Sequence, residues 1–171
     1  MRTPLFFAVS GLLTVPAFAA ELEINVEVPK LNVAEYHRPY VAVWLEGADQ
    51  KVAANLSVWY QMKETAEGHG TKWLPDLRQW WRRSGRTLSV PVDGVTGPTK
   101  PVGRHVLRFD DSAPQLKGLA QGDYTLVVEA VREVGGRELL KIPFSWPAKT
   151  AQSGKAQGDS ELGSVTLAVK P

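Results

Sequence analysis

Residues 72–86 hold the side chains whose types and spacing come closest to a chemical signature. The chain has six tryptophans in all, and this segment combines three of them with four arginines: Trp73, Trp80, Trp81, Arg78, Arg82, Arg83 and Arg86. Guanidinium groups bind carboxylates and phosphates, and Trp rings attract cations and aromatic groups. The segment therefore either presents a binding surface to a partner or forms a helix that covers the core.

Helical spacing gathers the large apolar side chains of this segment on one arc. They are Trp73, Leu74, Leu77, Trp80 and Trp81. Pro75 suits a first helical turn and Gly85 suits a helix end. The spacing predicts one short amphipathic helix, with the Trp side in the core and the arginines in solvent. In the alternative interpretation Trp80 stays outside with the arginines and binds an anionic group, an aromatic cofactor or a membrane headgroup.

Other candidates for chemistry are sparse. His37, His69 and His105 are far apart and show no metal-ligand spacing such as HxH or HExxH. The chain has no cysteine, which excludes thiol catalysis and cysteine-ligated metals. No GxSxG, SxxK or glycine-rich phosphate loop occurs. We therefore predict no catalytic residue, no metal site, no cofactor and no enzymatic activity.

Two acidic positions have structural interpretations. Glu129 lies in a strong strand pattern, on the same face as Val127 and Val131. If that face is buried, its carboxylate needs a cation such as Arg38 or Arg104. The pair at 110–111 precedes Ser-Ala-Pro, which predicts a turn.

The first residues have the pattern of a secretory signal peptide. Arg2 precedes a short apolar run that ends in Ala17-Phe18-Ala19. The run is shorter than the roughly 20 residues that a membrane span needs. We expect a signal peptide over 1–19, a single domain over 20–171, a periplasmic location and no transmembrane segment after cleavage.

The charges of the mature chain are nearly balanced. The chain has 20 basic and 18 acidic residues, and Arg2 is the only charge lost with the signal. Nucleic acid requires a broad basic surface, so we exclude it as a partner.

Hydrophobic patterning predicts a mainly β domain. Strands are expected at 22–28, 40–45, 56–62, 87–92, 104–109, 124–133, 138–146 and 165–169, the second of them buried on both faces. Gly135-Gly136 predicts a hairpin turn, and Tyr124 predicts a tyrosine corner. Residues 93–103 and 147–159 are expected to be connections. Roughly eight strands with one short helix indicate an immunoglobulin-like β-sandwich.

Three blocks of residues occur in a familiar order: 38–46 (RPYVAVWLE), 73–81 (WLPDLRQWW) and 122–138 (GDYTLVVEAVREVGGRE). They resemble the bacterial periplasmic family called domain of unknown function 2271. That family has no established activity, so no catalytic residue carries over. Its members are encoded near PepSY-type membrane proteins and flavin-transfer proteins, and the resemblance implies an accessory role in envelope redox or iron metabolism.

Two functions follow. The first is a non-enzymatic binding or accessory module of the cell envelope, with a PepSY-type membrane protein or another envelope redox protein as partner. Its contact residues are Arg78, Arg82, Arg83, Arg86 and Trp80. The second is a carrier of a metal or of a haem- or flavin-like anion, held by Arg78, Arg82 and either His37 or His105.

Overall fold

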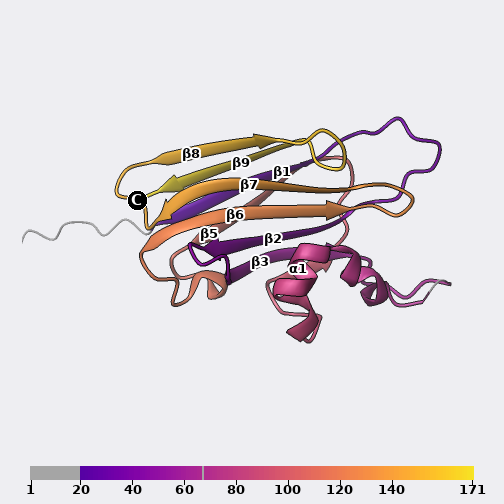
Figure 1. The fold of residues 1–171 in the computed structure, drawn as a ribbon, viewed down its shortest axis with the longest axis horizontal. Helices are drawn as coiled ribbons and strands as arrows, with labels where there is room; N and C mark the ends of the chain where they lie inside the picture. Colours follow the sequence, from indigo (N-terminus) through magenta and orange to yellow (C-terminus); the bar gives the residue numbers. More distant parts are fainter. Residues whose placement is uncertain (1–19, 67) are drawn as a thin grey trace, which may run out of the picture.

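The computed structural model describes residues 20–66 and 68–171, so the predicted signal peptide over 1–19 lies outside the described residues. Within them the strands form two packed sheets, which confirms the predicted mainly β sandwich (Figure 1). One sheet has the order β5-β1-β9-β8 and the other β4-β3-β2-β6-β7. All pairings are antiparallel except that of β3 with β4. The strands are β1 (Glu21–Val28), β2 (Tyr40–Gly47), β3 (Val52–Tyr60), β4 (Thr96–Pro98), β5 (Gly103–Asp110), β6 (Gly122–Val131), β7 (Arg137–Trp146), β8 (Gln152–Gln157) and β9 (Ser164–Lys170).

The main core lies between the sheets and follows from the alternation of apolar residues. In β1 every second residue is buried, beginning with Leu22 and ending with Val28. β2 is buried on both faces, as its continuous apolar run predicts. Its odd-numbered residues, such as Val43, face the other sheet, while Ala42 and Trp44 belong to a second, smaller core. That second core lies on the outer face of the five-stranded sheet.

A helical segment covers this second core, and it differs from the predicted single helix over 72–86. It consists of the 3-10 helix η1 (Gly70–Asp76), the α-helix α1 (Arg78–Arg83) and the 3-10 helix η2 (Gly85–Thr87). Leu77, with φ −71° and ψ 69°, separates η1 from α1, so the helical hydrogen bonds cannot continue. The predicted apolar side is correct for Leu74, Leu77 and Trp80, which are buried against β2, β3 and β6, and Trp81 packs there partly buried. It is wrong for Trp73, which lies outside this core and lines a cavity.

Three predictions about connections are confirmed. β6 and β7 form a hairpin in which Val131 pairs with Arg137. The Tyr124 hydroxyl donates a hydrogen bond to the Ala120 carbonyl at 2.7 Å, which is the tyrosine corner. Asp110 accepts hydrogen bonds from the main chain and side chain of Ser112, as expected for a turn.

Three other predictions were wrong. Residues 87–92 pair with no described strand; Thr87 belongs to η2, and Pro91 has no N–H to donate to a ladder. The connection over 93–103 contains the short strand β4, and the supposed loop over 147–159 contains β8. β8 has a weak strand composition, QSGKAQ, and pairing with β9 determines its conformation.

Candidate functional site

Trp80 anchors the helical segment in the second core. Its side chain is 0% exposed, and its indole Nε1 donates a hydrogen bond to Asn55 Oδ1 at 2.9 Å. Gly85 lies directly against the ring, since a Cβ there would come within 2.5 Å of a ring carbon of Trp80. The burial decides between the two interpretations of the tryptophans: Trp80 packs in the core and presents no ring to a partner.

Glu129, on β6, holds the beginning of α1 against the outer face of the five-stranded sheet. The carboxylate is 0% exposed and accepts hydrogen bonds from the main-chain N–H of Gln79 at 3.0 Å and of Trp80 at 2.8 Å. These N–H groups have no partner inside the helix, and the positive helix end favours a negative charge. The cation beside Glu129 is Arg137, whose Nε donates to Oε1. The prediction of Arg38 or Arg104 was wrong; the hairpin register, which places Arg137 diagonally across from Glu129, was the available signal.

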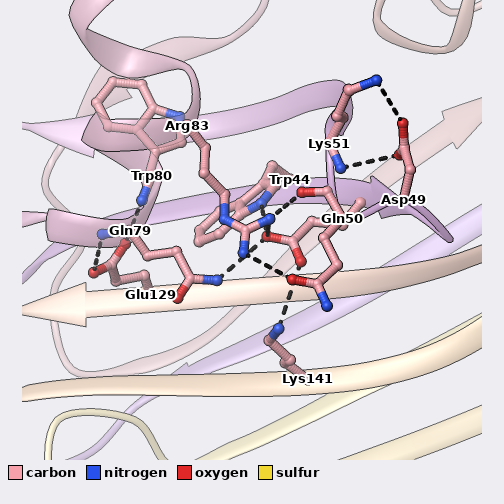
Figure 2. A network of polar contacts seen from close by, with 10 residues as sticks. Trp44, Asp49, Gln50, Lys51, Gln79, Trp80, Arg83, Glu129 and Lys141 are labelled. Atoms are coloured by element: carbon pink, nitrogen blue, oxygen red, sulfur yellow. Dashed lines mark hydrogen bonds and ion pairs between the residues drawn. The ribbon is translucent and has the colours of Figure 1, made fainter.

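A second buried carboxylate is that of Glu46, and Figure 2 labels its four partners Trp44, Gln79, Arg83 and Lys141. Glu46 is 2% exposed, and no sequence pattern singled it out. Its partners are the indole N–H of Trp44 at 3.0 Å, the Gln79 side-chain amide at 3.3 Å, Arg83 at 3.3 Å and Lys141 at 3.5 Å. Gln79 thus joins both carboxylates, through its main chain to Glu129 and through its side chain to Glu46.

The four predicted arginines separate into two groups. Arg83 is 22% exposed; it pairs with Glu46 and donates to the Gln50 carbonyl, so it binds the protein's own groups. Arg78, Arg82 and Arg86 are exposed and make no hydrogen bond or ion pair with any described residue. Arg78 and Arg82 lie four residues apart on α1, which brings them to the same side of that helix, and Arg86 follows in η2. We call these three residues the arginine face.

A cavity of about 660 Å³ opens at the end of the sandwich where β2 begins and β6 ends. Its walls come from the chain before β2, the end of β3, η1 and the turn between β6 and β7. The rings of Tyr36, Tyr40 and Trp73 line it together with the charged groups of Arg38, Asp76, Arg132 and Glu133. The volume falls within the roughly 300–1,000 Å³ typical of ligand sites.

Tyr40 reports the electrostatics of this cavity. Its hydroxyl donates a hydrogen bond to the Gly70 carbonyl at 3.1 Å. Burial raises the pKa of Tyr40 above its usual value, and the negative charges of Glu133 and Asp76 raise it further. A hydrogen bond with the main chain of Gln61 lowers the pKa but does not outweigh these effects. Both carboxylates are therefore close enough to act on the hydroxyl group.

The histidines do not come together. His37 lines the cavity, with Nε2 2.9 Å from Glu35 and Nδ1 3.5 Å from Glu133. His69 lies 3.5 Å from Glu64, and His105 contacts the Pro101 carbonyl on the four-stranded sheet. The described residues include no group of three or more His, Cys, Asp or Glu side chains arranged to hold a metal ion.

The ligand contacts predicted for a carrier are brought together only in part. Arg78 lines a small hollow beside the cavity, and the two share Asp76 and Val131 as lining residues. His37 and Arg78 therefore line neighbouring hollows rather than one site. His105 lines a separate hollow beside β4 and β5.

Comparison with known proteins gives one assignment. In the described part of the chain, no helix has both the length and the apolar character to cross a bilayer. No curated protein and no solved structure matches the chain. A family described as predicted periplasmic protein (DUF2271) matches residues 21–164, which include strands β1 to β8, the arginine face and the residues that line the cavity. The chain belongs to this family of predicted periplasmic proteins, as the three sequence blocks indicated.

Proposed function

We propose that the protein is a non-enzymatic binding module of the cell envelope, which docks an acidic protein partner through the arginine face. One observation carries the proposal: three exposed arginines without partners among the described residues stand on a segment that buried contacts hold in place. Trp80, Glu129 and Glu46 fix that segment from below. A surface that is already ordered loses little conformational entropy when it binds.

The charge around α1 defines the partner. Arg83, Lys141 and Arg137 together outnumber by one the two buried carboxylates with which they pair, Glu46 and Glu129. The outer side of this sheet is therefore positive, and guanidinium groups are frequent at the centres of protein interfaces. The partner we propose is an acidic surface of an envelope membrane protein, and the PepSY-type protein that the resemblance implied is the first to test.

The absence of catalysis is part of the proposal. Glu46 and Glu129, two fully buried carboxylates, accept hydrogen bonds from donors of the protein itself. A general acid or base needs an oxygen that reaches a substrate. Their contacts support a structural role.

The test replaces Arg78, Arg82 and Arg86 together by serine. The tagged protein is cross-linked in periplasm and solubilised membranes, captured partners are identified, and each is purified for a direct binding measurement. We expect the wild-type protein to bind its partner tightly at low salt and at least about tenfold more weakly at high salt, because exposed charges are screened. The triple variant should lose the same partner.

A matched control removes three exposed charges from other surfaces: Arg104, Lys117 and Lys155, each replaced by serine. This variant has the same net charge as the first but keeps the arginine face. It should bind like the wild type. If both triple variants bind equally, the arginine face is not the docking surface.

The cavity favours a second candidate function, that of a ligand carrier. It is large enough for a small molecule, and it is built on the ends of paired strands. A metal or a haem- or flavin-like anion was the cargo considered from sequence. Absorption spectra and metal analysis of the protein purified from its native periplasm test this candidate: a colourless, metal-free protein without a bound small molecule would oppose it.

A further inference from the structure

We propose that the cavity at the end of the sandwich binds a small organic cation, held by the rings of Tyr36, Tyr40 and Trp73 and by the carboxylates of Glu133 and Asp76. The inference rests on the second candidate function, the ligand carrier, and not on the arginine face. It proposes an organic cation, whereas the organic cargo considered from sequence was a haem- or flavin-like anion.

Three aromatic residues that line one cavity are the first observation. Tyr36 is 37% exposed although it is a large, partly apolar residue, so part of its ring is available to a ligand. Tyr40 and Trp73 are half-buried and line the same space. Aromatic rings attract ammonium groups through their negative faces, and groups of such rings are the usual binding sites for quaternary ammonium ligands.

The protein itself shows this attraction on Trp73. The ammonium nitrogen of Lys72 lies 4.1 Å from the centre of that ring. The contact comes from the neighbouring residue of the chain itself, and it places a cation over this ring.

The charges of the cavity supply the second observation. Arg132 is neutralised by Glu161, which accepts hydrogen bonds from Nε at 2.8 Å and from Nη2 at 3.2 Å. The Arg, Asp and Glu side chains that remain on the lining are Arg38, Asp76 and Glu133, which are two carboxylates against one guanidinium group.

Tyr40 shows where this negative charge acts. Both Glu133 and Asp76 raise the pKa of its hydroxyl group, in addition to the larger effect of burial. The same two charges that disfavour a phenolate at this wall favour a cation there. Aromatic faces and negative potential thus coincide at Tyr40.

Isothermal titration calorimetry with the full mature chain tests the proposal. The probes are choline, spermidine and 3,3-dimethylbutan-1-ol, which has the shape of choline without the charge. We expect saturable one-to-one binding of choline, of spermidine or of both, with a Kd below about 1 mM, and no binding of the neutral alcohol. The choline and spermidine results distinguish a quaternary headgroup from a polyamine.

Variants locate the site and test whether it prefers a positive charge. Tyr36→Ala should weaken binding about three- to tenfold, and the double variant Glu133→Gln/Asp76→Asn by at least about fivefold. Arg38→Gln removes the opposing charge and should strengthen binding about two- to fivefold. The matched control, Asp111→Asn, lies at the opposite end of the sandwich, next to the Glu21–Asp110 pair, and should bind like the wild type.

Three results would overturn the inference. They are the absence of saturable cation binding, equal binding of the neutral alcohol, and loss of binding in Arg38→Gln, which would indicate an anion or zwitterion site. Far-UV circular dichroism of each variant confirms that the fold is retained. Because these variants leave Arg78, Arg82 and Arg86 unchanged, a negative result here leaves the docking proposal to its own test.

Discussion

Glu46 and Glu129 show how single charged residues hold a functional surface in place. Each is a fully buried carboxylate on the outer side of the five-stranded sheet, and each bonds to the helical segment and to β7. A buried charge is tolerated only when several donors replace the lost water. Apart from the indole N–H of Trp44 on β2, those donors are groups of α1 and β7, so the carboxylates join elements that have no strand pairing with one another.

Glu129→Gln tests this role. The substitution removes the charge that faces Arg137 and places an amide N–H₂ against the N–H groups of Gln79 and Trp80. We expect the free energy of unfolding to fall by about 2–4 kcal/mol. Urea denaturation measures the change. Asp111→Asn, an exposed acid without a bond to another described side chain, should change it by less than about 0.5 kcal/mol.

Tyr40 predicts a dependence of stability on alkaline pH. Burial and two nearby carboxylates raise the pKa of its hydroxyl above the usual 10.0. Above that pH the unfolded chain loses this proton before the folded protein does, so stability falls as pH rises. Urea unfolding at about pH 9 and about pH 11 should show a smaller fall in Tyr40→Phe than in the wild type. An identical fall would mean that the hydroxyl of Tyr40 does not contribute.

At the scale of elements, local patterns predicted what is decided within one element. The alternation in β1, the apolar run in β2 and the hairpin turn at Gly135 were sufficient to predict those strands and that turn. Burial within a strand and turn geometry depend on residues that are neighbours in the sequence. β8 was missed because its strand conformation depends on pairing with β9. Gly154 shows the tertiary cause: a Cβ there would come within 2.3 Å of Ile142, so this strand needs a residue that looks like a loop signal.

In the candidate sites too, the sequence predicted what depends on neighbouring residues and missed what depends on the tertiary fold. The apolar side of residues 72–86 was predictable from spacing, and so was the exposure of three of its arginines. The structural role of Arg83 was not, because its partner Glu46 lies on β2. The cavity was invisible for the same reason: Tyr36, Trp73 and Glu133 lie in three separate segments that only the fold brings to one wall.

Glu138 holds the loop over residues 159–162 in place, and its ionisation makes the stability of that loop depend on pH. Its carboxylate accepts main-chain hydrogen bonds from Asp159 at 2.6 Å, Ser160 at 3.2 Å and Leu162 at 2.8 Å. Burial alone would raise the pKa of Glu138, but these N–H donors outweigh it and the pKa lies below its usual 4.5. A depressed pKa means that the stabilisation is present above that value and is lost as the pH falls through the folded pKa.

The matching prediction concerns Glu138→Gln. At about pH 7 the variant should be less stable than the wild type by about 1–2 kcal/mol, and the amides of 159–162 should exchange faster with solvent. Hydrogen exchange by NMR measures the second effect. At about pH 3 the difference in stability should shrink, because the carboxyl group of the unfolded wild-type chain is then largely protonated and the contribution of the ionised carboxylate falls. A difference that stays constant with pH would contradict this assignment.

At the scale of the whole molecule, both proposed surfaces depend on the same end of the sandwich. The cavity and the hollow that contains Arg78 share Asp76 and Val131. Between the two sheets at this end, the buried pair of Arg132 and Glu161 joins the chain just after β6 to the loop before β9. Gly135 lies on this guanidinium group, since a Cβ there would come within 2.6 Å of its carbon. The hairpin turn, the clamp between the sheets and the cavity wall are therefore one packed unit.

A double-mutant cycle on Arg132 and Glu161 tests whether this clamp holds the sheets together. Arg132→Met leaves the carboxylate of Glu161 buried with the Gly136 N–H as its remaining described donor, and should cost about 3–5 kcal/mol. Glu161→Gln leaves the guanidinium uncompensated, and Nη1 of Arg132 already has no partner among the described residues. The double variant buries no unpaired charge, so its loss in urea unfolding should be smaller than the sum of the single losses by at least about 1 kcal/mol. Additive losses would show that the two residues stabilise the protein independently, and the sheets would then be joined at this end by apolar packing alone.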